Sequence, residues 1–221
     1  MADPARDPST AFLERLAHDL RGPLSPLQTA AYLLRRGNVD AARQDELLEI
    51  IDRQTTRLSA MVQEVSDWMR AGQERLVGHR ESIEVPMLVE LACAPRAARV
   101  TQVVSPSLDQ RTVNGDTQRL VQMLATLLDF MGARASPGPV NLLAQPAGET
   151  VLIEIEAAGS RWDDAERGAL FNRAQDAPFD EGLGMRLMIA SAIARGHDGD
   201  VTVCDSPQGW ATVRVSLPFL G

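Results

Sequence analysis

Two long stretches with the helical spacing of apolar residues constrain the fold of this chain more than any other feature. Within residues 12–34, and again within residues 47–69, apolar side chains recur at steps of three and four, as on one face of an α-helix. Gly37 and Asn38 stand between the two stretches and are typical of a helix end. The apolar positions are Phe12, Leu13, Leu16, Leu20, Leu24, Leu27, Ala31 and Leu34, then Leu47, Ile51, Leu58, Met61, Val62, Val65 and Met69.

Two amphipathic helices joined by a short turn predict a helical hairpin. A single hairpin cannot cover both apolar faces, so we expect a homodimer in which two hairpins pair into a four-helix bundle with two-fold symmetry. The alternative is a hairpin that folds back onto the C-terminal part of its own chain. Pro23 and Pro26 fall inside the first helix and predict a kink about one turn after His18.

Beyond residue 82, strand patterns mixed with helical ones predict a second domain. The expected fold class is α+β: a helical hairpin that forms a dimeric four-helix bundle, followed by an α/β sandwich with one mixed sheet and helices on one face. The expected domains are a flexible tail at 1–8, the hairpin at 9–72, a linker at 73–81 and the sandwich at 82–221. The sandwich should contain helices at 86–98, 116–134 and 184–195, strands at 100–104, 112–116, 140–143, 151–155, 200–204 and 211–217, and a turn at Gln145–Gly148.

The composition excludes several kinds of partner. The chain of 221 residues is 44% hydrophobic with a formal net charge of −8, so it can bury a core, and it repels nucleic acids and anionic lipids. No run approaches the about 20 apolar residues of a membrane span, and the first eight residues do not resemble a signal peptide. The distant Cys93 and Cys204 fit a reducing compartment. We expect a cytoplasmic protein with no nucleic-acid or membrane partner and, if Met1 is the natural start, no preceding sensor domain.

The segment Ala17–Leu24 carries the residues best suited to chemistry. A neutral imidazole such as that of His18 is a nucleophile toward phosphoryl groups, and the adjacent Asp19 carboxylate can hold one ring nitrogen while the other attacks. Arg21 adds positive charge beside an incoming phosphate. The order His-Asp-Leu-Arg-Gly-Pro-Leu resembles the phosphoacceptor box of two-component sensor histidine kinases. The resemblance implies that His18, Asp19 and Arg21 form a phosphotransfer site.

The other histidines lack such a context. We expect His79 and His197 to be ordinary solvent-exposed side chains. The alternative interpretation of His18 is that it too is an ordinary surface histidine rather than a phosphoacceptor. No pair of histidines or carboxylates has the spacing of metal ligands, so no metal site is expected.

Four landmarks in the second domain resemble, in order and spacing, the ATP-binding domain of the same kinases. Residues 116–124 resemble the start of the N-box helix, and residues 170–173 resemble the phenylalanine box. Residues 182–187 resemble the last glycine box, and residues 209–213 resemble the closing hairpin. Together with the histidine box, the resemblance covers about residues 10–219.

The resemblance fails where Mg–ATP should bind. Phe130 occupies the N-box position at which the family has a metal-ligating asparagine, and a phenyl ring cannot ligate a hard cation. Thr126 replaces the earlier asparagine of this box, and Met131 replaces the alanine that follows the metal ligand. Ala157 stands where the family has the aspartate that accepts the adenine amino group, and Arg161 stands at a glycine position.

The neighbouring residues do not restore a nucleotide site. Trp162 is large enough to fill the vacated space, and Glu156 is one residue from the missing aspartate, a step that turns a strand side chain to the opposite face. The loop that should close over ATP is short and acidic, and it would repel a triphosphate. Its acids are Asp163, Asp164, Asp176, Asp180 and Glu181. We expect no cofactor, with vestigial pocket positions at Thr126, Phe130, Ala157, Gly159, Gly182 and Gly184.

These features predict a histidine phosphotransferase that carries phosphate on His18 between the receiver domains of response regulators without binding ATP. One alternative is a non-catalytic adaptor that docks a response regulator or a kinase. Another is an atypical histidine kinase with residual autokinase activity. Gly22 replaces the Asn or Thr that positions water in many related kinases, so the resemblance also implies weak phosphatase activity.

Overall fold

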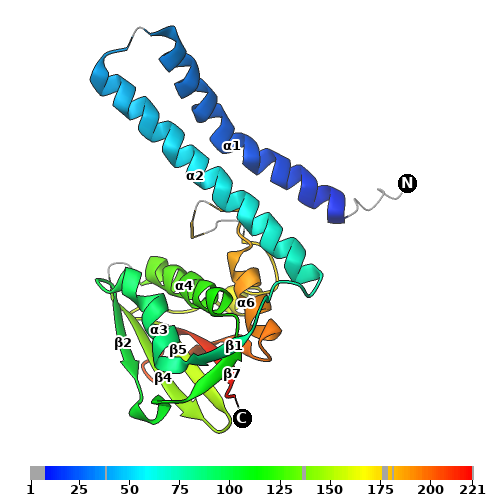
Figure 1. Cartoon of the computed structure of the whole chain (residues 1–221), viewed down its shortest axis with the longest axis vertical. Coiled ribbons are helices and arrows are strands. Elements are labelled where there is room, and N and C mark those ends of the chain that lie inside the picture. The colour runs from blue at the N-terminus through cyan, green and yellow to red at the C-terminus, as the bar shows by residue number, and fades with distance from the viewer. Residues whose placement is uncertain (1–7, 38, 136–137, 176–178, 181, 221) are drawn as a thin grey trace. The chain divides into compact units, whose positions relative to one another are not determined.

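The computed structural model describes residues 8–37, 39–135, 138–175, 179–180 and 182–220 (Figure 1). The chain divides into two compact units. The first contains the chain up to Ser66 together with Asp180–Leu183, and the second contains Asp67–Phe179 and Gly184–Gly221.

The first unit is the expected helical hairpin. It is formed by α1 (Pro8–Arg36) and most of α2 (Ala41–Gly72). Leu47 and Met61, two of the predicted apolar positions of α2, are fully buried. α1 continues as one helix through Pro23 and Pro26, so neither proline ends it, and a kink at these residues stays a prediction.

The turn between the two helices closes at Gly37, as expected. Its φ of 66° is left-handed, which glycine adopts without strain, and its N–H donates to the Leu34 carbonyl at 3.2 Å. The neighbouring Asn38 lies outside the described residues. α2 begins with an N-cap, because the Asp40 side chain accepts a hydrogen bond from the Arg43 N–H at 2.8 Å.

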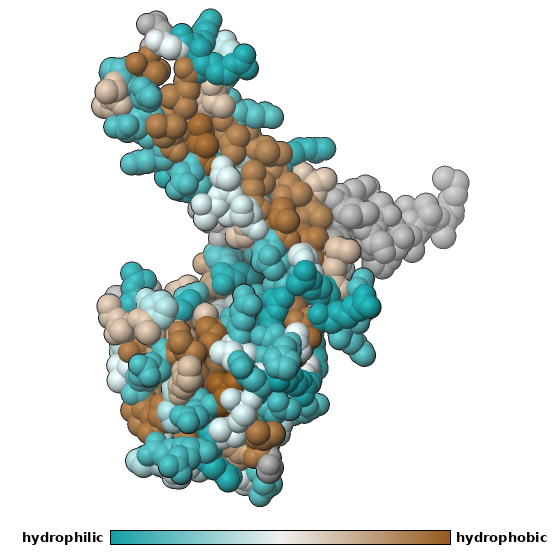
Figure 2. All heavy atoms as spheres, viewed as in Figure 1, coloured by the Kyte–Doolittle hydropathy of each residue, from teal (hydrophilic) through white to brown (hydrophobic). Residues whose placement is uncertain are grey.

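Part of the apolar face of the hairpin stays uncovered. Leu48 and Val62 lie two heptads apart on α2 and are 47% and 62% exposed, and Tyr32 on α1 is also exposed. Figure 2 shows apolar surface running along the hairpin. An apolar stripe of this kind usually marks an interaction surface. It is not a membrane span, because no helix in the described ranges is both long enough and apolar enough to cross a bilayer.

The second unit is built on a five-stranded sheet with the strand order β2-β4-β5-β7-β6. β2 is parallel to β4 and the other neighbours are antiparallel, so the sheet is mixed, as expected. Its strands are β2 (Val100–Val104), β4 (Val140–Ala147), β5 (Thr150–Ala157), β6 (Asp200–Asp205) and β7 (Ala211–Pro218).

Three helices cover one face of this sheet (Figure 1). They are α3 (Val85–Cys93), α4 (Thr117–Arg134) and α6 (Arg186–Gly196). Shorter helical segments are α5 (Asp164–Arg167) and the 3₁₀ turns η1 (Ala94–Arg96) and η2 (Pro106–Leu108). The core between the helices and the sheet consists mainly of aliphatic side chains, such as Leu124, Leu127 and Ile153.

Two details of the expected sheet are wrong. β1 (Glu81–Glu84), which the sequence pattern did not predict, pairs with β3 (Thr112–Gly115) in a separate two-stranded antiparallel sheet. β1 buries only Ile83, which is too little to show as an alternating pattern in the sequence.

The turn between β4 and β5 lies at Gly148 and Glu149, later than expected. Pro146 belongs to β4 because β2 pairs with β4 only as far as Ala144, so no neighbouring strand needs an N–H donor from position 146.

A buried ion pair fixes the last turns of α2 to α4. The Asp67 carboxylate is 1% exposed and accepts hydrogen bonds from Arg119 Nη1 and Gln122 Nε2, each at 2.9 Å. Arg119 Nη1 also donates to Gln122 Oε1 at 2.7 Å. Because these buried polar groups satisfy one another, the end of α2 is part of the second unit.

Candidate functional site

His18 lies on the surface of α1 with one ring nitrogen paired. Its Nδ1 is 3.1 Å from Asp19 Oδ1, and 85% of its side chain is exposed. Because a carboxylate only accepts hydrogen bonds, this contact places the proton of the neutral ring on Nδ1. Nε2 then carries a lone pair that faces solvent, which is the arrangement that a nucleophilic imidazole requires.

Arg21 and Gly22 extend this surface along α1. Arg21 is exposed one turn after His18, at the i+3 spacing that places side chains on one side of a helix. Gly22 is also exposed, and a Cβ atom added there would meet no atom within 4 Å. Packing therefore does not require glycine at this position.

Phe130, one of the positions predicted to belong to a vestigial nucleotide pocket, is part of an aromatic cluster. Phe130 of α4 stacks on Trp162, with ring centroids 6.2 Å apart and an interplanar angle of 18°. Phe179 meets Phe130 edge-on at 5.5 Å. Phe130 and Trp162 are only 5% and 7% exposed. We call Phe130, Trp162 and Phe179, with the flanking Arg134 and Arg186, the aromatic cluster.

Two guanidinium groups flank the rings of this cluster. Arg134 lies 4.5 Å from the Trp162 centroid and 6.0 Å from that of Phe130, and Arg186 lies 5.7 Å from that of Phe179. These distances suit cation–π attraction. Arg134 was not predicted from the sequence, because its contact with Trp162 joins residues that are far apart in the chain.

Hydrogen bonds hold Arg134 and Trp162 of the aromatic cluster in place. Arg134 Nη2 donates to Glu166 Oε2 at 2.5 Å and to the Arg161 carbonyl at 3.0 Å. Trp162 Nε1 donates to the Cys204 carbonyl at 2.8 Å. Arg134 Nε, in contrast, is buried without a hydrogen-bond partner. The rings of the cluster are therefore held by hydrogen bonds from several elements, although one polar atom at its edge is left unsatisfied.

Two further predicted pocket positions lie on α4 and β5. Thr126 and Ala157 are buried, and the methyl group of Ala157 offers no hydrogen-bond acceptor for an adenine. Glu156 is directed to the opposite face of the sheet, where its Oε1 accepts from Asn141 Nδ2 of β4 at 3.0 Å. Glu156 and Ala157 therefore point to opposite faces of the strand, as their spacing predicted.

The glycines of this region differ in what requires them. Gly184 has a φ of 79°, and a Cβ atom there would lie 2.4 Å from the Gln175 carbonyl oxygen, so this position demands glycine. Gly159 also has a positive φ, but it is exposed and has open space around it. Gly182 falls in the first unit, whereas Gly184 falls in the second.

The acidic loop contributes structure as well as charge. The Asp163 side chain caps α5 by accepting from the Ala165 N–H at 2.9 Å, and Glu166 completes a capping box with it. Asp176 and Glu181 lie outside the described residues. Within the described ranges, no group of three His, Cys, Asp or Glu side chains is placed to hold a metal ion.

The prediction that His197 is exposed is wrong, whereas His79 is exposed as expected. His197 is 2% exposed. Its Nδ1 lies 2.7 Å from the Ile193 carbonyl, and its Nε2 accepts from the Asp116 N–H at 3.0 Å. Gly196, Asp198 and Gly199 are typical of a surface turn, which is why the sequence predicted an exposed side chain. The His197 ring instead packs inward at the end of α6.

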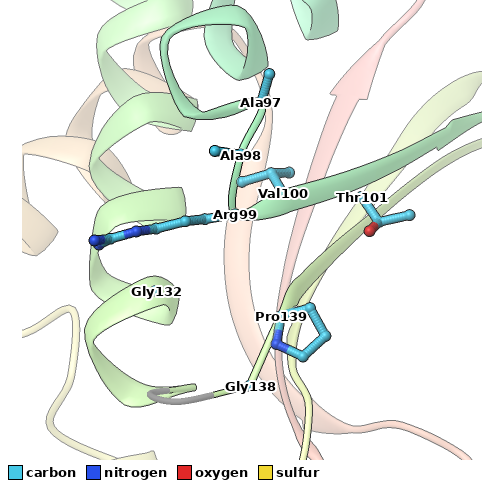
Figure 3. A pocket seen from close by; sticks show the side chains of 8 residues that line it. All are labelled: Ala97, Ala98, Arg99, Val100, Thr101, Gly132, Gly138 and Pro139. Atoms are coloured by element: carbon cyan, nitrogen blue, oxygen red, sulfur yellow. The ribbon is translucent and has the colours of Figure 1, made fainter.

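A separate hollow of about 500 Å³ lies where the start of β2 faces the end of α4 (Figure 3). Small residues such as Ala97, Gly132 and Gly138 line it, and Arg99 is its only charged residue among those described. Figure 3 shows the Arg99 side chain reaching toward the turn of α4 that contains Gly132. Because no carboxylate, thiol or imidazole of the described residues lines it, this hollow offers no reactive group.

Two family models match the chain. Residues 9–74 match the His Kinase A (phospho-acceptor) domain, and residues 115–221 match the histidine kinase-, DNA gyrase B- and HSP90-like ATPase. The chain therefore belongs to the two-component histidine kinase family.

Known sensor proteins are similar along most of the chain. The Sensor protein TorS of Escherichia coli K12 is 25% identical over 99% of this chain and 25% of its own length. A bacteriophytochrome of Pseudomonas aeruginosa is 27% identical over 85% of this chain and 27% of its own length. The chain thus spans about a quarter of the length of these two relatives.

Solved kinase structures share the fold. The histidine kinase AdeS of Acinetobacter baumannii superposes with a TM-score of 0.67 at 16% identity, over 91% of this chain and 97% of that one. The histidine kinase ThkA, solved in complex with the response regulator TrrA, gives 0.69 at 16% identity, over 94% of this chain and 61% of that one. The predicted fold class, a helical hairpin followed by an α/β sandwich, is therefore confirmed.

Proposed function

We propose that this chain is a histidine phosphotransferase of a two-component phosphorelay, which carries a phosphoryl group on His18 between receiver domains and does not bind ATP. The observation that supports the proposal is the aromatic cluster, in which the buried Phe130 stands at the position where the resemblance places the metal ligand of a kinase of this family. His18, in contrast, keeps the orienting carboxylate and an open ring nitrogen.

The residues of the pocket do not fit Mg–ATP. Phe130 presents a buried ring where an oxygen ligand is needed for a hard cation. Ala157 is fully buried and carries no acceptor. Trp162 occupies the interior next to both Phe130 and Arg134. A nucleotide would have to displace a stacked and hydrogen-bonded cluster, and the exposed Asp163 and Asp164 would repel its phosphates.

The chemistry at His18 needs no nucleotide. Nε2 attacks the phosphorus of a receiver's aspartyl phosphate, the bond from phosphorus to the carboxylate oxygen breaks, and the receiver recovers its carboxylate. The proton stays on Nδ1, where Asp19 stabilises the positive charge that the ring gains. The reverse step passes the phosphoryl group to the carboxylate of a second receiver. Because transfer of this kind depends mainly on positioning and charge neutralisation, a histidine on a rigid helix is sufficient when the receiver brings its metal.

The partners that follow are receiver domains and a second copy of the chain. ThkA, which shares the fold, is described as a complex with a response regulator. The uncovered stripe that includes Leu48 and Val62 supports a homodimer of hairpins. The residues of the site are His18 as phosphoacceptor, Asp19 as orienting base and Arg21 as the cation beside the phosphate.

The test is phosphate acceptance by the full chain from a panel of receivers phosphorylated by a small phosphodonor. The wild-type protein and a His79→Gln control should gain an acid-labile phosphate, and His18→Gln should gain none. Absence of any transfer to the wild-type protein, with receivers that accept phosphate from another kinase, contradicts the proposal.

The match of residues 115–221 to the ATPase family model favours one competing function, residual autokinase activity. Incubation with γ-labelled ATP and Mg²⁺ separates the two. A phosphotransferase stays unlabelled, whereas a kinase acquires label that His18→Gln removes. If neither the wild type nor His18→Gln accepts phosphate, and the substitution leaves the cellular response unchanged, a non-catalytic adaptor is the better description.

A further inference from the structure

The buried His197 directly joins two segments of the second unit, the junction of β3 with α4 and the end of α6. Its Nε2 accepts the N–H of Asp116, the N-cap of α4, and its Nδ1 lies against the Ile193 carbonyl near the end of α6. The ring packs directly on Gly115, because a Cβ atom there would lie 2.9 Å from the ring Cδ2. Neighbouring backbone thus encloses the imidazole on the β3–α4 side, and its own helix encloses it on the other.

The segment that follows α2 is fixed at the same place. The Gly78 N–H donates to Asp116 Oδ2 at 2.9 Å. Arg80 donates to Asp198 Oδ2 at 3.0 Å and to the Gly196 carbonyl. We call His197, Asp116, Ile193 and the segment Gly78–Arg80, with the hydrogen bonds among these parts of the chain, the joint. The joint therefore includes the stretch that connects α2 to the sheet domain.

The hydrogen bonds require a neutral ring with the proton on Nδ1. The Asp116 N–H is a donor, so Nε2 must be an acceptor, and the Ile193 carbonyl is an acceptor, so Nδ1 must be the donor. A proton added to Nε2 would set two donors against each other at 3.0 Å. One of them must then move, and the tight packing on Gly115 leaves the ring no room to turn within the joint.

The charged groups around the ring are Arg80 from the preceding segment, Asp116 from the start of α4, and Asp198 beside His197. Burial is the main cause that lowers the pKa of His197 from its ordinary value, and Arg80 acts in the same direction. The Ile193 carbonyl, Asp116 and Asp198 act in the opposite direction but do not outweigh burial.

We propose that His197 is a proton-sensitive clamp that holds the start of α4, the end of α6 and the segment Gly78–Arg80 together while its ring is neutral, and that protonation opens this joint. The proposal concerns the sheet domain and does not depend on phosphate transfer by His18. Protonation would loosen the N-terminus of the helix that carries Thr126 and Phe130.

The direction of the pH effect follows from linkage. Because the folded pKa lies below the ordinary value of about 6.5, the unfolded chain binds the proton more tightly. The clamp's stability is therefore complete above about pH 6.5 and is lost as the pH falls from there through the lowered folded pKa. Within that window, one such histidine changes the unfolding equilibrium constant by up to about tenfold per pH unit.

The first test is NMR of the histidine side chains in the full chain. At pH 7.5, ¹⁵N shifts of His197 should show the Nδ1–H tautomer, and its titration midpoint should lie below the ordinary histidine value of about 6.5. An Nε2–H tautomer, or a midpoint at or above that ordinary value, overturns the proposal. This measurement uses the wild-type protein, so it decides the matter even where a variant does not fold.

The second test is urea unfolding between pH 7.5 and pH 5 for the wild type, His197→Gln and the matched control His79→Gln. Glutamine keeps an acceptor for the Asp116 N–H but does not titrate. His197→Gln should lose the part of the pH dependence that one proton explains, and His79→Gln should keep it. Equal pH dependence in all three proteins contradicts the clamp.

Discussion

At the scale of single residues, His18 leaves one ring nitrogen open to solvent, whereas His197 uses both of its nitrogens inside the fold. The difference comes from the neighbours of each ring. Asp19 binds only Nδ1 of an imidazole that is otherwise exposed, whereas the Asp116 N–H and the Ile193 carbonyl enclose His197. The first residue is therefore suited to nucleophilic attack and the second to holding structure.

Gly22 gives a prediction that separates stability from chemistry. Because open space surrounds this helical glycine, Gly22→Ala should raise the free energy of unfolding by roughly 0.5–1 kcal/mol, measured with urea.

Gly22→Asn should also fold and should speed the loss of phosphate from a phosphorylated receiver, because the amide can hold a water near His18. If Gly22→Asn leaves this rate unchanged, the prediction from the resemblance that Gly22 weakens phosphatase activity is wrong.

Trp162 gives a second prediction at this scale. Trp162→Ala should lower the free energy of unfolding by about 3–5 kcal/mol, because it leaves a cavity beside Phe130. Trp162→Phe keeps a ring but loses the bond to the Cys204 carbonyl, so its loss should be smaller, and urea titrations compare the two. Both variants should still accept phosphate on His18 while folded. A loss below about 1 kcal/mol for Trp162→Ala would mean that the cluster is not a packed core.

At the scale of elements, local signals predicted some boundaries and tertiary contacts decided others. The start of α4 was predictable because Asp116 is a side-chain N-cap that accepts from the Arg119 N–H. α6 begins at Arg186, two residues later than expected, because the left-handed Gly184 cannot be part of a helix. The pairing of β1 with β3 joins residues that are far apart in the sequence. The four residues of β1 alone therefore did not predict a strand.

The candidate site divides in the same way. The histidine box could be identified from the sequence because its residues are adjacent in the chain. Phe130, Ala157 and Trp162 could be identified because they depart from the family pattern. The sequence did not predict that Phe179 and Arg134 would join Phe130 and Trp162 in one cluster. Those contacts depend on how separate segments pack, which no local pattern encodes.

The uncovered stripe of α2 gives the prediction for this scale. Val62→Glu should convert a dimer into a monomer at micromolar concentrations, because a carboxylate would be buried in the bundle without a partner. Mass measured by light scattering after size exclusion gives the result. Ala60→Glu places the same charge on an exposed position on the other side of α2 and should leave the mass unchanged. Dimers of equal stability in both variants would show that the stripe is not the interface.

At the scale of the whole molecule, the two units keep different parts of the family's machinery. The first presents the histidine box on an exposed helix, and the second keeps the sheet and helices of the ATPase fold with a filled interior. Mg–ATP should therefore leave the melting temperature of the chain unchanged. A ligand at about 100 times its Kd would add about 2.7 kcal/mol, which calorimetry detects readily. A clear upward shift would contradict the proposed loss of ATP binding.

The aromatic cluster consists of the protein's own side chains, so its occupancy does not vary with the energy state of the cell. Under the proposed function, the chain would act as a reversible exchanger, through which phosphate moves until donor and acceptor reach the same transfer potential. The direction of flow would then be set by whichever receiver an upstream enzyme keeps charged, and the chain itself would add no driving force.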